Sequence, residues 1–141
     1  VSAMNSGYYD LRGKIVKAER RLSVLNERLE MWVQYQKYKP VRQKLDKVSP
    51  GKKEQFEQRH NAELALFDAA VRYLDTLKAS GEAITPKAWR AETQRLTAEK
   101  EADYLTMRDM REDIKAVETL KKTADRLAKE GQTQRREEQE R

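Results

Sequence analysis

A seven-residue repeat of apolar side chains runs through the first part of the chain. Two sets of residues occupy the two seam positions of a heptad: Tyr8, Ile15, Leu22 and Leu29 in one, and Leu11, Ala18, Leu25 and Trp32 in the other. A repeat kept over about four heptads is typical of a helix that packs along one narrow stripe. The repeat does not identify the partner, so packing against a later helix of the chain and homodimerisation both remain open.

Composition limits how thick the core of this chain can be. Charged residues make up 38% of the sequence and the mean hydropathy is −1.02, while only two Phe and two Trp are present. Ala, Leu, Glu, Lys, Arg and Gln are abundant, and these residues favour helices. We therefore predict an all-α fold: an elongated antiparallel helical bundle or coiled coil of two long helices plus a middle helical hairpin.

Proline and glycine divide the chain into four predicted helices, over residues 6–38, 41–48, 50–79 and 86–130. Lys39-Pro40 is expected to interrupt the first run, because the residue before proline is disfavoured in helical geometry. Ser80-Gly81 predicts a helix end, and Gly131 is expected to end the last helix. We expect residues 1–130 to form a single helical domain and the polar tail, residues 131–141, to be disordered.

Two further apolar stripes follow the first at helical spacing. The second contains Phe56, His60, Leu64, Phe67, Val71, Leu74 and Leu77, and the third contains Trp89, Leu96, Met107, Met110, Ile114, Val117, Leu120, Ala124 and Leu127. Spacings of three and four residues place each set on one face of a helix. These stripes are the predicted core.

The sequence offers little that could carry catalysis. It has no Cys and one histidine, His60, whose spacing from Phe56 and Leu64 indicates a position at the edge of the core. The Tyr8-Tyr9 pair is read as packing, because a tyrosine nucleophile acting on DNA needs a bound metal, and no cluster of histidines is present to hold one. No glycine-rich phosphate loop occurs. We expect no catalytic site, no metal and no cofactor.

Compartment and membrane association are also addressed by the sequence. Its apolar runs are too short to span a bilayer, so no membrane insertion is predicted. The absence of Cys and of a signal peptide favours a cytoplasmic protein. The first residue is Val1 rather than Met, and we expect the chain to be a fragment of a longer protein.

Residues 34–60 carry most of the excess positive charge, +5 of the formal net +6. Clustered Lys and Arg attract phosphates, and an aromatic ring can stack on an unpaired base; Tyr35, Tyr38 and Phe56 are interleaved with the cations. The candidate nucleic-acid-binding residues are Lys37, Lys39, Arg42, Lys44, Lys47, Lys52, Lys53 and Arg59. A solvated hairpin end is also rich in lysine, so a role in solubility alone remains open.

Two long blocks of the sequence resemble a known family. They are FEQRHNAELALFDAAVRYLDTL, from Phe56, and ITPKAWRAETQRLTAEKEADYLTMRDMREDIKAVETLKKTADRLAKE, from Ile84. Together they are similar to the C-terminal helical region of relaxases, the mobilisation nucleases of conjugative transposons and mobilisable plasmids. Their order and spacing carry the resemblance, which covers about residues 15–130, since helical patterning alone is common.

The resemblance implies a role in conjugative DNA transfer. Relaxases cut DNA with an N-terminal domain that has a tyrosine nucleophile and a three-histidine metal site, and this chain has a single histidine. It would therefore be a non-catalytic C-terminal module. Implied partners are DNA, through the basic hairpin, and the coupling ATPase, secretion channel or an accessory transfer protein; a homodimer is also open. The alternative is a generic coiled-coil scaffold or adaptor, and a membrane-surface helix is a third, less favoured reading.

Overall fold

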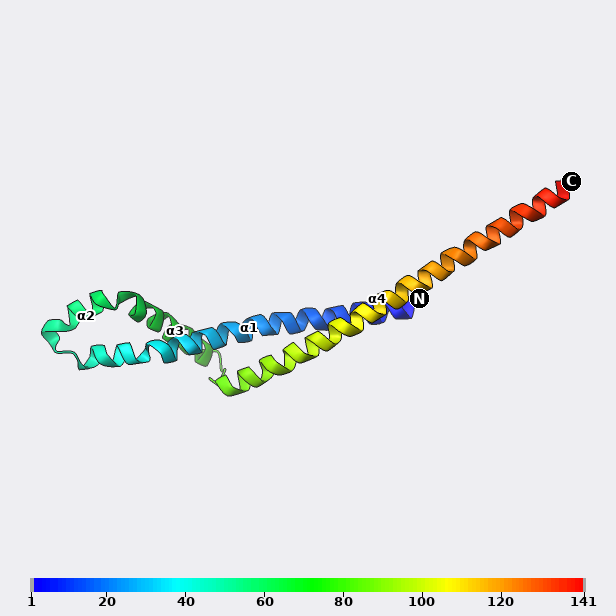
Figure 1. Ribbon diagram of the computed structural model, residues 1–141. Helices are drawn as coiled ribbons and strands as arrows, with labels where there is room; N and C mark the ends of the chain where they lie inside the picture. The colour runs from blue at the N-terminus through cyan, green and yellow to red at the C-terminus, as the bar shows by residue number, and fades with distance from the viewer. Residues whose placement is uncertain (1, 141) are drawn as a thin grey trace. The chain divides into compact units, whose positions relative to one another are not determined.

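The computed structural model describes residues 2–140, and every regular element in that range is helical. The elements are α1 (Ser2–Lys47), the short 3₁₀ helix η1 (Pro50–Lys52), α2 (Lys53–Arg59), α3 (Asn61–Ala79) and α4 (Pro86–Glu140) (Figure 1). The all-α prediction is confirmed. The long helices α1 and α4 pack against each other, as expected for an antiparallel helical bundle.

The chain divides into two compact units. The hairpin unit is Glu19–Thr97, and the terminal unit combines α1 up to Ala18 with the chain from Ala98 onward. A single domain was expected over residues 1–130; in the structure α1 and α4 each contribute to both units. Within the described residues, no helix combines the length and apolarity needed to cross a bilayer.

The core of the hairpin unit lies where three helices meet. Leu25 of α1, Leu74 of α3 and Trp89 of α4 form a buried cluster, and Leu25 is 0% exposed. Partly buried apolar residues surround it: Leu29, Trp32, Tyr35, Tyr73, Leu77, Ile84 and Leu96. All eight residues of the predicted heptad seam are buried or half-buried, so the repeat correctly identified the inward face of α1.

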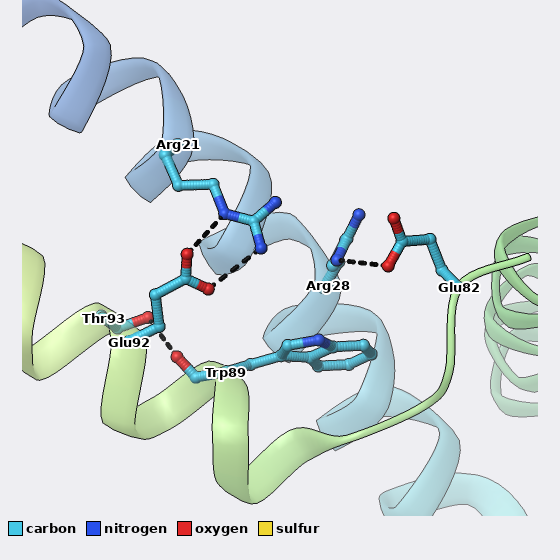
Figure 2. A network of polar contacts seen from close by, with 6 residues as sticks. All are labelled: Arg21, Arg28, Glu82, Trp89, Glu92 and Thr93. Carbon is cyan, nitrogen blue, oxygen red and sulfur yellow. Dashed lines mark hydrogen bonds and ion pairs between the residues drawn. The ribbon is translucent and has the colours of Figure 1, made fainter.

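Polar contacts fasten α1 to the beginning of α4 beside this core (Figure 2). Arg21 donates two hydrogen bonds to the Glu92 carboxylate, from Nε at 2.8 Å and from Nη2 at 3.0 Å. Hydrogen bonding to Arg21 lowers the pKa of Glu92 below its ordinary value. Arg28, which is 7% exposed, lies over the Trp89 ring at 5.6 Å and pairs with Glu82 at 3.8 Å. The start of α4 is thereby fixed in register with α1.

In the terminal unit, α1 and α4 run antiparallel. Lys14 Nζ lies 3.5 Å from Asp103 Oδ2, and Arg111 Nη2 donates to the Tyr8 hydroxyl at 3.2 Å. Ile15 and Met107 are the buried apolar residues here. The predicted third stripe is therefore only partly covered: its members up to Val117 are buried or half-buried, whereas its last three, Leu120, Ala124 and Leu127, are exposed.

Several predicted helix boundaries were wrong, and the separate helix predicted over residues 41–48 is the last part of α1. The first helix does not end at Tyr38, because α1 continues through Pro40 to Lys47. Proline removes one helical hydrogen bond and costs about 3 kcal/mol in a helix interior. The turns beyond Pro40 are held by the buried side chain of Leu45 and by half-buried Val41, and this packing offsets the cost.

The predicted helix over residues 50–79 is divided, and the last helix is longer than expected. His60 leaves helical geometry (φ −112°, ψ 22°), closes α2 through its N–H to the Phe56 carbonyl, and accepts the Leu64 N–H at the start of α3. The helix α4 does not end at Gly131 but continues to Glu140. One glycine costs only about 1 kcal/mol relative to alanine, and the flanking Lys, Arg, Glu and Gln are strong helix formers, so residues 131–140 are helical rather than irregular.

Candidate nucleic-acid interface

The hairpin unit brings the basic segment to one end of α1 and α3. The helix α1 runs out to Lys47, the chain reverses through η1 and α2, and α3 returns beside α1 (Figure 1). The Gln34 side-chain amide donates to the Leu66 carbonyl, and the Tyr35 and Phe67 rings stack with centroids 5.4 Å apart. We call the end beyond these contacts the basic tip, defined by Lys37, Lys39, Arg42, Lys44, Lys47, Lys52, Lys53 and Arg59.

The reversal has a local cause in the sequence. Ser49 precedes Pro50 and adopts extended backbone geometry (φ −62°, ψ 146°), as expected for a residue before proline. Pro50 then begins η1, whose turn is closed by the Lys52 N–H to the Ser49 carbonyl at 2.9 Å. Buried Leu45 and half-buried Phe56 lie on either side of the turn. The predicted basic residues lie on the helical elements that meet at it, the end of α1, η1 and α2.

The cations of the basic tip face solvent with little compensation. Seven of the eight are exposed, and Lys53 is half-buried. Within residues 2–140, Arg42 is the one member of the tip that forms an ion pair, with Asp46 at 3.7 Å. Lys37 lies over the Tyr38 ring at 5.3 Å and Lys39 over the Tyr35 ring at 5.5 Å. The tip is therefore a positive surface whose charges are free to meet phosphates.

An aromatic groove lies beside the basic tip. It has a volume of about 590 Å³ and is lined by Trp32, Tyr35, Lys39, Phe67, Val71, Leu74, Asp75, Lys78 and Ile84. Trp32, Tyr35 and Phe67 form a continuous stack, with successive centroids 5.6 and 5.4 Å apart and both pairs of ring planes at 22°. Lys39 belongs to both the groove and the tip, so the two surfaces adjoin.

The three aromatic residues that are interleaved with the cations in the sequence lie in different surroundings in the structure. Tyr35 lines the groove, Tyr38 lies beneath Lys37, and Phe56 packs against the His60 ring at 4.4 Å. Sequence reasoning missed Phe67 and Lys78 as groove residues. Their only signal was the spacing of Phe67, Val71, Leu74 and Lys78 along one side of α3, which also describes an ordinary core stripe.

The residues weighed for catalysis make structural contacts. His60 Nδ1 lies 3.4 Å from Glu63 Oε2, at the junction of α2 and α3. The half-buried Tyr8 accepts its hydrogen bond from Arg111 and packs edge-on against Tyr9. Across the described part of the chain, no group of three or more His, Asp or Glu side chains is placed to hold a metal ion.

Comparison with protein-family models, with curated proteins and with solved structures finds no match for this chain. The proposal of its function therefore starts from the tip and the groove described above.

Proposed function

We propose that this chain is the non-catalytic C-terminal module of a relaxase and that it contacts DNA through the basic tip during conjugative transfer. The observation that supports the contact is the exposure of seven cations at one end of the hairpin unit, where only Arg42 has a carboxylate partner among the described residues. Each phosphate that a Lys or Arg neutralises releases condensed counterions, which favours binding. The resemblance to relaxases supplies the biological setting.

The composition of the tip favours contact with the DNA backbone over base reading. Six of its eight cations are lysines, and the lysine ammonium acts as a point charge without the planar fork that arginine uses for bidentate pairing. Phosphate contacts position a protein on DNA and carry no sequence information directly. The expected role is to hold DNA after another part of the relaxase has selected and cut it.

A second candidate function is that of a coiled-coil scaffold or adaptor. The exposed end of the third stripe favours it: Leu120 and Leu127 on α4 are 69% and 57% exposed and lie seven residues apart. Such a stripe is the kind of face that packs against another helix. In the transfer setting its partner would be the coupling ATPase, an accessory transfer protein or a second copy of the chain.

Salt-dependent binding to a labelled duplex oligonucleotide, followed by fluorescence anisotropy, tests the role of the tip. The test variant carries Lys44→Glu, Lys52→Glu and Lys53→Glu. The matched control carries Lys121→Glu, Lys122→Glu and Lys129→Glu, three exposed lysines of α4, so both variants have the same net charge. Losing three duplex phosphate contacts is expected to reduce the slope of log affinity against log salt by about 2.7, at about 0.9 per contact.

The control separates a specific surface from general charge. Binding that weakens at least tenfold more in the tip variant than in the control supports the proposal. Equal weakening in both variants refutes contact through the basic tip. No binding by the unaltered chain at low salt refutes DNA contact altogether and leaves the scaffold function. In the full-length relaxase, deletion of this region is expected to spare nicking of a supercoiled origin plasmid and to lower the frequency of transfer; unchanged transfer would contradict the proposed setting.

A further inference from the structure

The aromatic groove has the volume of a small-molecule site. Its volume of about 590 Å³ falls in the range of about 300–1,000 Å³ that is usual for small-molecule sites. It is bounded by α1, by α3 and by Ile84 just before α4, all within the hairpin unit. Trp32, Tyr35 and Phe67 are each only half-buried, so their rings are partly accessible from the groove.

The chemistry of the lining is divided between an apolar floor and charged residues. Stacked rings and aliphatic side chains form the floor, while exposed Lys39, Lys78 and Asp75 supply a net positive charge. A flat apolar group attached to an anion matches both parts, because its face can stack on a ring while its charge meets the lysines. A nucleobase with its phosphate has this combination.

Adjacency to the basic tip selects among such ligands. Lys39 lies over the Tyr35 ring at 5.5 Å and is also a member of the tip. A strand whose phosphates lie along the tip would pass directly beside the groove. The bases of a duplex are stacked and paired inside the helix, whereas an unpaired base can turn outward and stack on an aromatic side chain.

We propose that the aromatic groove holds an unpaired base of a single DNA strand whose phosphates lie along the basic tip, next to Lys39 and Lys78. This inference rests on the proposed function and narrows it, since it assigns the module a preference for single-stranded over duplex DNA. The tip supplies the salt-dependent attraction common to both forms of DNA. The groove supplies the stacking contact that only the single strand can make.

Measurements on two variants distinguish the contribution of the groove to DNA binding from that of the tip. Affinities are measured by anisotropy for a labelled single strand and for a duplex of the same length. Phe67→Leu keeps an apolar side chain in the groove but removes a ring, and is expected to weaken single-strand binding about tenfold, within the range reported for loss of one base stack. Duplex binding is expected to change less than twofold. Tyr9→Leu, at an exposed ring of the terminal unit, is the matched control.

The second variant, Lys78→Gln, changes an exposed side chain and therefore tests the groove even if Phe67→Leu disturbs folding. It is expected to reduce the single-strand salt slope by about 0.7, the value for one lost phosphate contact on a single strand. The duplex slope should remain unchanged.

A 2-aminopurine base placed in the single strand gives an independent readout, because its fluorescence falls when it stacks on a ring. Quenching by the unaltered chain and its loss in Phe67→Leu support the groove. Equal affinity for both forms of DNA, with neither variant altering single-strand binding, overturns this inference while leaving the tip contact intact. Absence of binding to either form refutes the proposed function and this inference together.

Discussion

Replacing Leu25 with alanine should destabilise the hairpin unit more than any other single leucine truncation in it. Leu25 is 0% exposed and meets Leu74 and Trp89 at the junction of three helices. Removing three buried carbons costs about 2.4 kcal/mol at about 0.8 kcal/mol each. The surroundings are held by the Arg21–Glu92 contact, so the cavity should collapse only in part, and the total expected cost is about 3–4 kcal/mol.

Urea unfolding followed by tryptophan fluorescence measures this cost in the correct part of the molecule. Both tryptophans, Trp32 and Trp89, lie in the hairpin unit, so the signal reports its unfolding and not that of the terminal unit. For a slope of about 2 kcal/mol per molar urea, Leu25→Ala should lower the midpoint by about 1.5–2 M. Circular dichroism in the same samples checks that the variant is helical without denaturant.

Leu66→Ala is the matched control, because it makes the same chemical change in the same unit at a side chain that is 41% exposed. Only part of the transfer free energy is lost there and solvent fills the vacated space, so the expected cost is about 1 kcal/mol. A Leu25→Ala cost below about 1.5 kcal/mol, or equal costs at the two positions, would refute the three-helix core on which the groove is built.

Three further predictions concern single contacts and glycines. Arg21 holds the pKa of Glu92 below its ordinary value of 4.5, so the ion pair stabilises the fold above pH 4.5 and its contribution is lost as the pH falls through the lowered pKa. Glu92→Gln should therefore cost a few tenths to about 1 kcal/mol of unfolding free energy at pH 7, and in urea titrations at pH 3 the difference from the unaltered chain should shrink. Gly81 has φ 91°, so Gly81→Ala should destabilise by about 1 kcal/mol through backbone strain alone, because open space surrounds the added carbon; an unchanged urea midpoint would contradict this. Gly131→Ala, in a helix interior with equally open surroundings, should instead raise the helical circular dichroism signal and add about 0.5–1 kcal/mol of local stability, and a loss of signal would show that residues 131–140 do not continue α4.

The packing faces could be predicted from the sequence because helical periodicity records burial directly. The seam residues Ile15, Leu22 and Leu25 are buried, as are Leu64 and Leu74 of the second stripe. Periodicity states which face is apolar but not how far a partner extends along it. The third stripe therefore continues through Leu120 and Leu127 in the sequence, while the structure covers it only as far as Val117.

Helix ends were predicted less well because local signals compete with packing. Pro40 and Gly131 both disfavour helix, yet α1 and α4 pass through them, since costs of about 1–3 kcal/mol can be offset by neighbouring residues. The helix break at His60 was missed for the opposite reason. Phe56, His60 and Leu64 keep their four-residue spacing across it, so a single nonhelical residue leaves the apolar pattern intact.

The candidate site depends on contacts that no local pattern contains. Its cations were visible because they fall within one short stretch of the chain, residues 37–59. The groove instead joins Trp32 and Tyr35 of α1 to Phe67 and Lys78 of α3, which are more than thirty residues away in sequence. They meet because α3 returns along α1 and is held there by the core around Leu25. The basic tip requires only the local reversal at Ser49-Pro50. Loss of the three-helix core should therefore abolish a preference for single-stranded DNA before it abolishes salt-dependent attraction to DNA, which makes the ratio of the two affinities the sensitive measure of the folded groove.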